Sequence, residues 1–196
     1  MTKKELEKIY DDVGDFYEDR TRVKKNNKYS FVDLDGKTIT PIIYDWVGYF
    51  YEGRVWVRKN KKYGFIDLDG KNITSIIYDD VGDFHEGRAK VELNGKCGFI
   101  DLDGKVVVHL IYDWVGYFSE SRVCVRLNSK FGFIDLNGNV IVPLIYDYAD
   151  NFQKCRAKIK LNGEIGYIDL DGNLEIEYQH DFIKEVFRDD TIYGKE

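Results

Sequence analysis

Apolar and charged residues alternate in short segments that return at a constant spacing along the chain. In residues 88–93, Arg-Ala-Lys-Val-Glu-Leu, every second side chain is apolar, which is the period of a β-strand with one buried face. Asn94-Gly95 follows directly, and Asn-Gly is a favoured pair for a two-residue hairpin turn. The pattern predicts a second strand over 97–101 and, after a Leu-Asp-Gly turn, a third over 106–108.

The whole pattern repeats with a constant period. A Tyr-Asp pair marks it, and its tyrosines are Tyr10, Tyr44, Tyr78, Tyr112 and Tyr146, each 34 residues after the last. A repeat kept in step without insertions indicates units that pack against copies of themselves. We predict a single repeat domain, 1–196, with units at residues 10–43, 44–77, 78–111, 112–145 and 146–178 and a degenerate closing segment at 179–196.

Each unit is predicted to be a three-stranded antiparallel meander followed by a connector of about a dozen residues. Pro41 and Pro143 are expected to end the third strand in their units, because proline cannot donate to the ladder. Such small units must pack against neighbours, either around a ring or along a line. The predicted fold is all-β: a small β-propeller-like ring of about five three-stranded blades, with a six-bladed ring or an open β-solenoid as alternatives.

The amino-acid composition agrees with this fold, and the net charge argues against some classes of partner. The 196 residues include 15 Tyr, 12 Phe and only 2 Pro, which favours pleated strands joined by tight turns. No apolar run approaches the length of a membrane span, and the three cysteines form no disulfide pattern. A cytoplasmic location is therefore expected. The net charge of −6 argues against DNA or an anionic membrane as partner.

The residues of one unit resemble a known family. Phe-His-Glu-Gly-Arg-Ala at 84–89, Gly-Phe-Ile-Asp at 98–101 and Tyr112-Asp113 are similar to the WG-repeat, or KWG-repeat, unit. The resemblance implies a β-repeat fold, no catalytic residues and a role as an interaction scaffold. To a lesser degree the chain is similar to a WG-repeat type VI anti-CRISPR protein, which implies a CRISPR effector nuclease as partner. The tryptophan that precedes glycine in the family is replaced by Tyr29, Tyr63, Cys97, Phe131 and Ile165.

The sequence contains little that indicates catalysis. The Asp-Leu-Asp-Gly turns resemble part of a calcium loop but lack its remaining ligands. His85, His109 and His180 do not stand at metal-ligand spacing with each other or with a cysteine. No nucleophile motif surrounds the cysteines. We therefore predict a protein that is not an enzyme and has neither a metal nor a cofactor.

Departures from the repeat carry the functional prediction. After each Tyr-Asp pair, the first and the fourth residue are acidic in one unit and aromatic in the next. These positions form the predicted partner-binding set: Asp12, Asp15, Trp46, Tyr49, Asp80, Asp83, Trp114 and Tyr117. Duplication of a 68-residue pair of units would also produce this alternation. Exposed Trp and Tyr beside charges are typical of protein-binding hot spots.

A second departure is a local excess of positive charge in the first two hairpins. The predicted basic patch consists of Arg22, Lys24, Lys25, Lys28, Trp56, Arg58, Lys59, Lys61 and Lys62. Such a patch could bind RNA or a ribonucleoprotein, or it could be solubilising charge on outer strands. The leading hypothesis is a non-enzymatic module that binds a protein partner, an RNA-guided host-defence nuclease among the candidates. RNA binding and a structural scaffold are the alternatives.

The arginine at the start of each unit's first strand is predicted to have a structural role. Arg88 is expected to pair with Asp101 or Asp79, partly buried between units.

Overall fold

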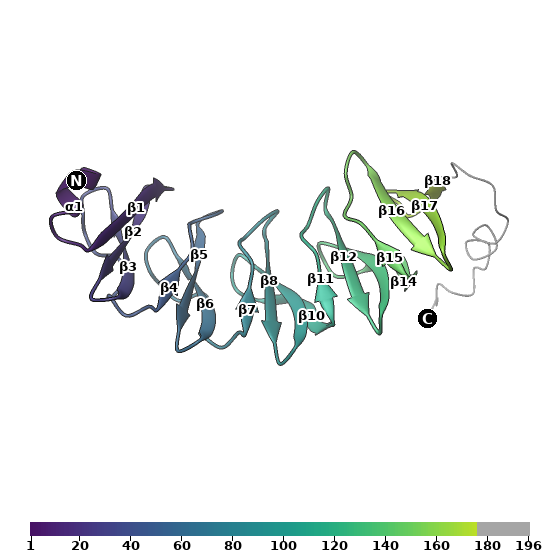
Figure 1. The fold of residues 1–196 in the computed structure, drawn as a ribbon, viewed down its shortest axis with the longest axis horizontal. Helices are drawn as coiled ribbons and strands as arrows, with labels where there is room; N and C mark the ends of the chain where they lie inside the picture. Colours follow the sequence, from purple (N-terminus) through teal and green to yellow (C-terminus); the bar gives the residue numbers. More distant parts are fainter. Residues whose placement is uncertain (176–196) are drawn as a thin grey trace. The chain divides into compact units, whose positions relative to one another are not determined.

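The computed structural model describes residues 1–175, which form antiparallel β-sheets and one short helix (Figure 1). The chain divides into two compact units, Met1–Ile111 and Tyr112–Glu196. Five sheets of three or four strands lie within the described residues. The predicted all-β repeat fold is confirmed. No closed sheet forms within residues 1–175, and the closure of a ring stays a prediction.

The first compact unit holds the helix and three sheets (Figure 1). The elements are α1 (Lys3–Leu6), then β1 (Asp12–Tyr17), β2 (Arg20–Lys25) and β3 (Lys28–Asp33) in the first sheet, β4 (Trp46–Val47), β5 (Arg54–Lys59) and β6 (Lys62–Asp67) in the second, and β7 (Asp80–Val81), β8 (Arg88–Leu93), β9 (Lys96–Asp101) and β10 (Val106–Tyr112) in the third. Leu6 of α1 is fully buried against Val13, Val23 and Val32, so the helix covers one face of the first sheet.

The second compact unit holds two four-stranded sheets. They are β11 (Trp114–Val115), β12 (Arg122–Leu127), β13 (Lys130–Asp135) and β14 (Val140–Tyr146), followed by β15 (Tyr148–Ala149), β16 (Arg156–Leu161), β17 (Glu164–Asp169) and β18 (Leu174–Glu175). The closing segment predicted at 179–196 lies outside the described residues, as does His180.

The structure corrects the predicted strand plan in two ways. The prediction placed no strand in the connectors, but those after the first each contribute a two-residue strand, such as β4, that pairs with the next long strand, and the first contributes the longer β1. The third strand also varies: Thr38 makes only an isolated bridge to Val32, whereas β14 runs through Pro143. Proline is tolerated there because β14 is the last strand of its sheet, so one edge of its ladder needs no donors.

The hairpin turn has the predicted cause, and the structure gives a cause for the strand glycines. Asn94 and Gly95 have φ of 54° and 73°, the left-handed values that an Asn-Gly hairpin turn requires. Gly98 lies so near the next strand that an added Cβ would sit 2.3 Å from the Val108 carbonyl oxygen. The neighbouring backbone therefore explains the glycine in the second strand of most units.

Aromatic rings join one sheet to the next inside each compact unit. Phe31 and Phe50 lie edge to face with centroids 4.9 Å apart, and Phe65 and Phe84 repeat this contact at 5.2 Å. In the second compact unit Phe133 and Phe152 do so at 4.8 Å. Such buried pairs are stabilising beyond their buried area, and they join the sheets of one compact unit in the same way.

The Asp of each Tyr-Asp pair fixes a hairpin turn. Asp45 accepts a hydrogen bond from the backbone N–H of Asn60 at 2.7 Å and binds the Lys28 ammonium of the preceding sheet. Asp147 does the same with Asn162 and Lys130. The Lys28 hydrogen bond, with the Asn60 N–H, holds the pKa of Asp45 below its usual value. These aspartates are therefore structural.

The glutamates that stand two residues after Phe16, Phe50 and Phe118 link successive units. The Glu18 carboxylate accepts from the backbone N–H of Gly53 at 2.8 Å, and Glu52 accepts from Gly87 at 2.9 Å. Glu120 accepts from the Cys155 N–H at 2.9 Å in the second compact unit. We call these contacts the glutamate links.

The predicted pairing of the repeat arginine with aspartate is not the contact that the structure shows. Arg54 donates from Nε to the Leu102 carbonyl at 2.8 Å, in the turn of the next unit, and Arg20 and Arg122 make equivalent bonds. Asp79 instead binds Lys62 and the Asn94 N–H, and Asp101 accepts from N–H groups of its own turn. A carbonyl at the matching place satisfies the Nε atom of Arg20, Arg54 and Arg122, so the aspartates are left to hold turns. In the last described sheet Arg156 pairs with the Glu175 carboxylate at 2.6 Å.

Candidate protein-binding surface

In every sheet, three residues lie directly opposite one another on adjacent strands and share one face. We call each set a cross-strand row. The rows are Asp12–Lys24–Tyr29, Trp46–Arg58–Tyr63, Asp80–Glu92–Cys97, Trp114–Arg126–Phe131 and Tyr148–Lys160–Ile165. The alternation that the sequence shows at one position therefore extends over three strands.

The rows of the second and fourth sheets have the same chemistry, a tryptophan, an arginine and a second aromatic residue. Trp46 and Trp114 are 43% and 38% exposed. The guanidinium carbon of Arg58 lies 6.0 Å from the Tyr63 ring centroid, and Arg126 lies 5.8 Å from Phe131. At these distances the ring faces attract the cations.

The aromatic residues of the predicted partner-binding set and the predicted basic patch meet in the first compact unit. The guanidinium carbon of Arg22 lies 5.0 Å from the Tyr49 centroid and 5.7 Å from that of Trp46. Tyr17 packs on Tyr49 with centroids 4.8 Å apart. We define the Trp46 patch as Tyr17, Arg22, Trp46, Tyr49 and Arg58. The sequence alone did not predict this meeting, because it depends on how the first two sheets stack.

Two arginines of the Trp46 patch each have a side-chain nitrogen without a hydrogen-bond partner. The Nε atoms of Arg22 and Arg58 are buried and have no acceptor. Arg22 reaches Trp46 from the first sheet, and Arg58 faces Trp46 in its own row. Buried donors are normally paired, so an unpaired one calls for an explanation.

Several other residues of the predicted basic patch are engaged within the protein. Lys28 and Lys62 form ion pairs with Asp45 and Asp79, the turn-holding aspartates. The other members divide by element: Lys24 and Lys25 lie in β2 above Tyr29 and Tyr10, Trp56 and Lys59 lie in β5, and Lys61 lies in the hairpin turn. The charge is thus broken up instead of forming one continuous cationic surface.

The predicted acidic positions also have internal partners. Asp80 lies opposite Glu92, and the Lys90 ammonium stands 3.5 Å from Asp80. Asp83 accepts from the Trp56 indole N–H at 2.9 Å, and burial raises the pKa of its carboxyl group.

The first unit shows the same behaviour at its two acidic positions. Asp15 accepts from Lys3 of α1 at 2.7 Å, and Asp12 faces Lys24 in its row. The aromatic positions, rather than the acidic ones, therefore offer the surface that a partner would contact.

The fourth-sheet row lines a small pocket in the second compact unit. Its volume is 270 Å³, and its walls are Trp114, Arg126, Phe131, Tyr148, Ala149, Asp150 and Asn151. Tyr148 donates to the Asp150 carboxylate, a hydrogen bond that raises the pKa of the tyrosine. Tyr117, also predicted to bind a partner, is 66% exposed and is not in the pocket wall. We call the 270 Å³ pocket lined by the fourth-sheet row the Trp114 pocket.

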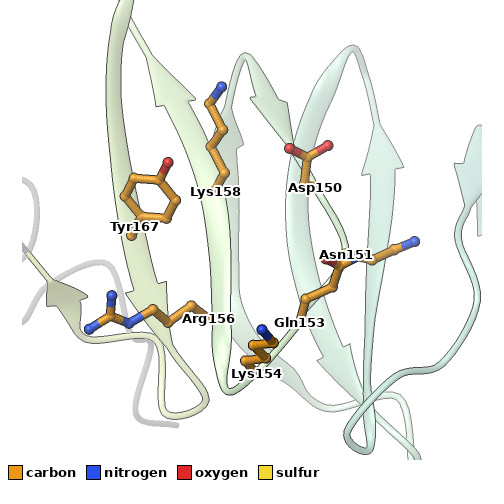
Figure 2. A pocket seen from close by; sticks show the side chains of 7 residues that line it. All are labelled: Asp150, Asn151, Gln153, Lys154, Arg156, Lys158 and Tyr167. Atoms are coloured by element: carbon orange, nitrogen blue, oxygen red, sulfur yellow. The ribbon is translucent and has the colours of Figure 1, made fainter.

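The last described sheet has a larger polar pocket (Figure 2). It has a volume of 760 Å³ and is lined by Asp150, Asn151, Gln153, Lys154, Arg156, Lys158 and Tyr167. Tyr167 stands where the other units have a buried phenylalanine: Phe133 is 0% exposed and Tyr167 is 36% exposed. No described sheet covers this face of residues 156–169, so the pocket marks the place where the described repeats stop.

Features that would support catalysis are few in the described part of the chain. Within residues 1–175, no group of three or more His, Cys, Asp or Glu side chains could hold a metal ion. Burial raises the pKa of Cys124 to about 12, so its thiol stays protonated and is a poor nucleophile. The helix in this part of the chain is too short to span a membrane.

Similar solved structures have little sequence identity to this chain. Hsv2 of Kluyveromyces marxianus is 10% identical with a TM-score of 0.46, and the match covers 83% of this chain and 63% of that one. Hsv2 of Kluyveromyces lactis is 10% identical with a TM-score of 0.47, covering 82% and 59%. PorZ of Porphyromonas gingivalis is 11% identical with a TM-score of 0.41, covering 84% and 25%. The chain spans less than two thirds of each, and these likenesses carry no argument about function. Among curated proteins, none matches the sequence.

A family match covers most of the chain. The model described as WG containing repeat matches residues 6–29, 29–63, 63–97, 98–131 and 131–164. None of the matches supports the predicted likeness to an anti-CRISPR protein. Five consecutive copies over this length confirm the family predicted from the repeat, and the protein belongs to the WG-repeat family.

Proposed function

We propose that this protein is a non-enzymatic binding module that recognises a protein partner through the Trp46 patch and the Trp114 pocket. The observation that carries the proposal is the pair of equivalent rows in which an exposed tryptophan faces an arginine and a second aromatic residue. Trp, Tyr and Arg are the residues most enriched among binding hot spots.

The placement of these side chains supports the same proposal. Constant residues, such as Asp45 and Glu52, hold the sheets together through hydrogen bonds within the chain. Trp46 and Trp114 pack on Tyr29 and Phe131 but take no part in those hydrogen bonds, and they stay partly exposed. An exposed aromatic patch with arginine beside it is typical of a surface that a partner covers. The more specific prediction of a CRISPR effector nuclease as partner stays a prediction.

The test is capture of partners by immobilised protein from a lysate of its source cells, with and without RNase. Trp46→Ala and Trp114→Ala should each lose the captured protein while thermal unfolding is unchanged. Tyr51→Ala is the matched control, because Tyr51 is 41% exposed but belongs to neither site. Capture that survives both tryptophan substitutions, or that disappears with RNase, would contradict the proposal.

A further inference from the structure

We infer that the Trp46 patch binds an acidic segment of a partner protein, in which carboxylates lie on both sides of the Trp46 indole. The inference rests on the proposed function and names the chemistry of the segment that the patch recognises. It starts from Arg22 and Arg58, which approach Trp46 from the first sheet and from the neighbouring strand.

Both arginines are held in place by aromatic rings, and one nitrogen of each lacks an acceptor. Arg22 lies over Tyr49 and Trp46, and Arg58 lies over Tyr63. The Nε atom of each is buried and makes no hydrogen bond. Elsewhere in the repeat, the arginines Arg20 and Arg54 donate from Nε to a carbonyl oxygen. Both side chains are partly exposed, so the patch presents two guanidinium groups that aromatic rings hold in place at the surface.

A carboxylate is the group that suits such a guanidinium. Ring faces hold the planar fork in one orientation, which lowers the entropy lost when it binds. A carboxylate matches the fork with two parallel hydrogen bonds, and these charge-assisted bonds are the strong ones. Trp46, which lies beside Arg22 and opposite Arg58, adds a partly exposed apolar surface, so an acidic segment with an apolar side chain at its centre fits the whole patch.

Phosphate would also suit the arginines, but the surroundings disfavour a nucleic acid. A bound single strand needs a positive groove that follows its backbone. The rows on either side of the Trp46 row carry carboxylates, Asp12 in the first sheet and both Asp80 and Glu92 in the third. Lys28 and Lys62 are neutralised by ion pairs. A partner with separate carboxylates avoids the repulsion that a continuous polyanion would meet.

The experiment measures binding of a fluorescein-labelled short peptide with acidic residues on both sides of a leucine. The comparison probes are the same peptide with every acid replaced by its amide and a labelled oligouridylate. All proteins carry Trp114→Ala, so that the Trp114 pocket does not contribute. Arg22→Gln and Arg58→Gln should each weaken binding of the acidic peptide by roughly tenfold or more, because a charge-assisted hydrogen bond is lost.

Two further variants separate a specific contact from net charge. Lys59→Gln removes one charge from the same strand as Arg58 and should change the affinity by less than about twofold, as expected for a partly exposed charge outside the Trp46 patch. Arg22→Lys keeps the charge and should still weaken binding, because lysine lacks the planar fork. Circular dichroism confirms that each variant is folded, and Arg22→Lys is the milder variant should Arg22→Gln fail to fold.

The outcomes are decisive in both directions. Binding that requires the acids and both arginines supports the inference. Equal binding of the acidic and amide peptides, no binding of either, or tighter binding of the oligouridylate with a steep dependence on salt overturns it. The capture experiment with Trp46→Ala is independent of the peptide, so protein binding by the patch can stand when recognition of acids fails.

Discussion

The second and third sheets have the same framework and opposite surfaces. In both, a two-residue strand pairs with a long hairpin, an Asp holds the turn, and a phenylalanine packs on the neighbouring sheet. The row of the second sheet is Trp46–Arg58–Tyr63, and the row of the third is Asp80–Glu92–Cys97. The difference teaches that constant positions build the sheet, while the row is free to vary without a change of fold.

The largest expected effect comes from breaking the framework and leaving the rows intact. Phe65→Ala removes a buried ring that packs on Phe84 and should lower the free energy of unfolding by about 3–5 kcal/mol. Tyr167→Ala, at the equivalent position of the half-exposed last sheet, should cost less than about 1 kcal/mol. Urea unfolding measures both. Equal losses would show that Phe65 does not hold two sheets together.

The next effect is on binding and comes from exchanging rows. Trp46→Asp places in the second sheet the residue type that the third sheet has at the equivalent position, Asp80. We expect it to reduce the amount of captured partner at least tenfold, because a hot-spot residue contributes about 2 kcal/mol to binding. The reverse change, Asp80→Trp, should leave the fold intact because it removes a like charge opposite Glu92. Far-ultraviolet circular dichroism and thermal melting check the fold of both. Unchanged capture by Trp46→Asp would remove the functional difference between the two sheets.

A smaller effect concerns the dependence of stability on pH. The pKa of Asp45 is held below its usual value by Lys28 and by the Asn60 N–H. A depressed folded-state pKa stabilises the protein above the unfolded pKa of about 4, and this contribution is lost as the pH falls through the folded-state pKa. Asp45→Asn should therefore lower the melting temperature at pH 7 and make no difference below the folded-state pKa. A gap between the two melting curves that stays constant with pH would contradict this role.

The smallest effect is expected at Asp83, a variable position of the third sheet. Burial raises the pKa of Asp83, opposed in part by the Trp56 N–H. A raised folded-state pKa in an acid means that ionisation destabilises the fold as the pH rises through that pKa. Asp83→Asn keeps an oxygen for Trp56 and should be as stable as the original protein at pH 7 or slightly more so, within about 0.5 kcal/mol. A clear loss of stability would mean that Asp83 has a structural duty like that of Asp45.

The regular parts of the fold could be predicted because their causes are local. Alternation in residues 88–93 and the Asn94-Gly95 turn specify a hairpin whatever surrounds them. The two-residue strands, such as β4, were missed because so short a segment has no periodicity of its own. The end of the third strand at Pro143 was wrong because proline is excluded only where both ladder edges are used.

The candidate site was predictable only in part for the same reason. The positions of Trp46 and Trp114 could be read from the broken repeat, and the register of a hairpin places Arg58 beside Tyr63. The contact of Arg22 with Trp46 comes from the stacking of separate sheets, which a repeat pattern does not specify. The predicted pairing of repeat arginines with aspartates was wrong for Arg20, Arg54 and Arg122, because their Nε atoms donate to backbone carbonyls, which a pattern of side chains does not reveal.

The glutamate links have a consequence for how such a gene can change. Each joins one unit to the next through the same two atoms, the carboxylate of Glu18, Glu52 or Glu120 and a backbone N–H in the following turn. Recombination that removes or adds a whole unit would leave every joint with a compatible partner. A single-codon insertion inside a unit would break the joints on both sides, so this lineage is expected to diversify by shuffling entire modules.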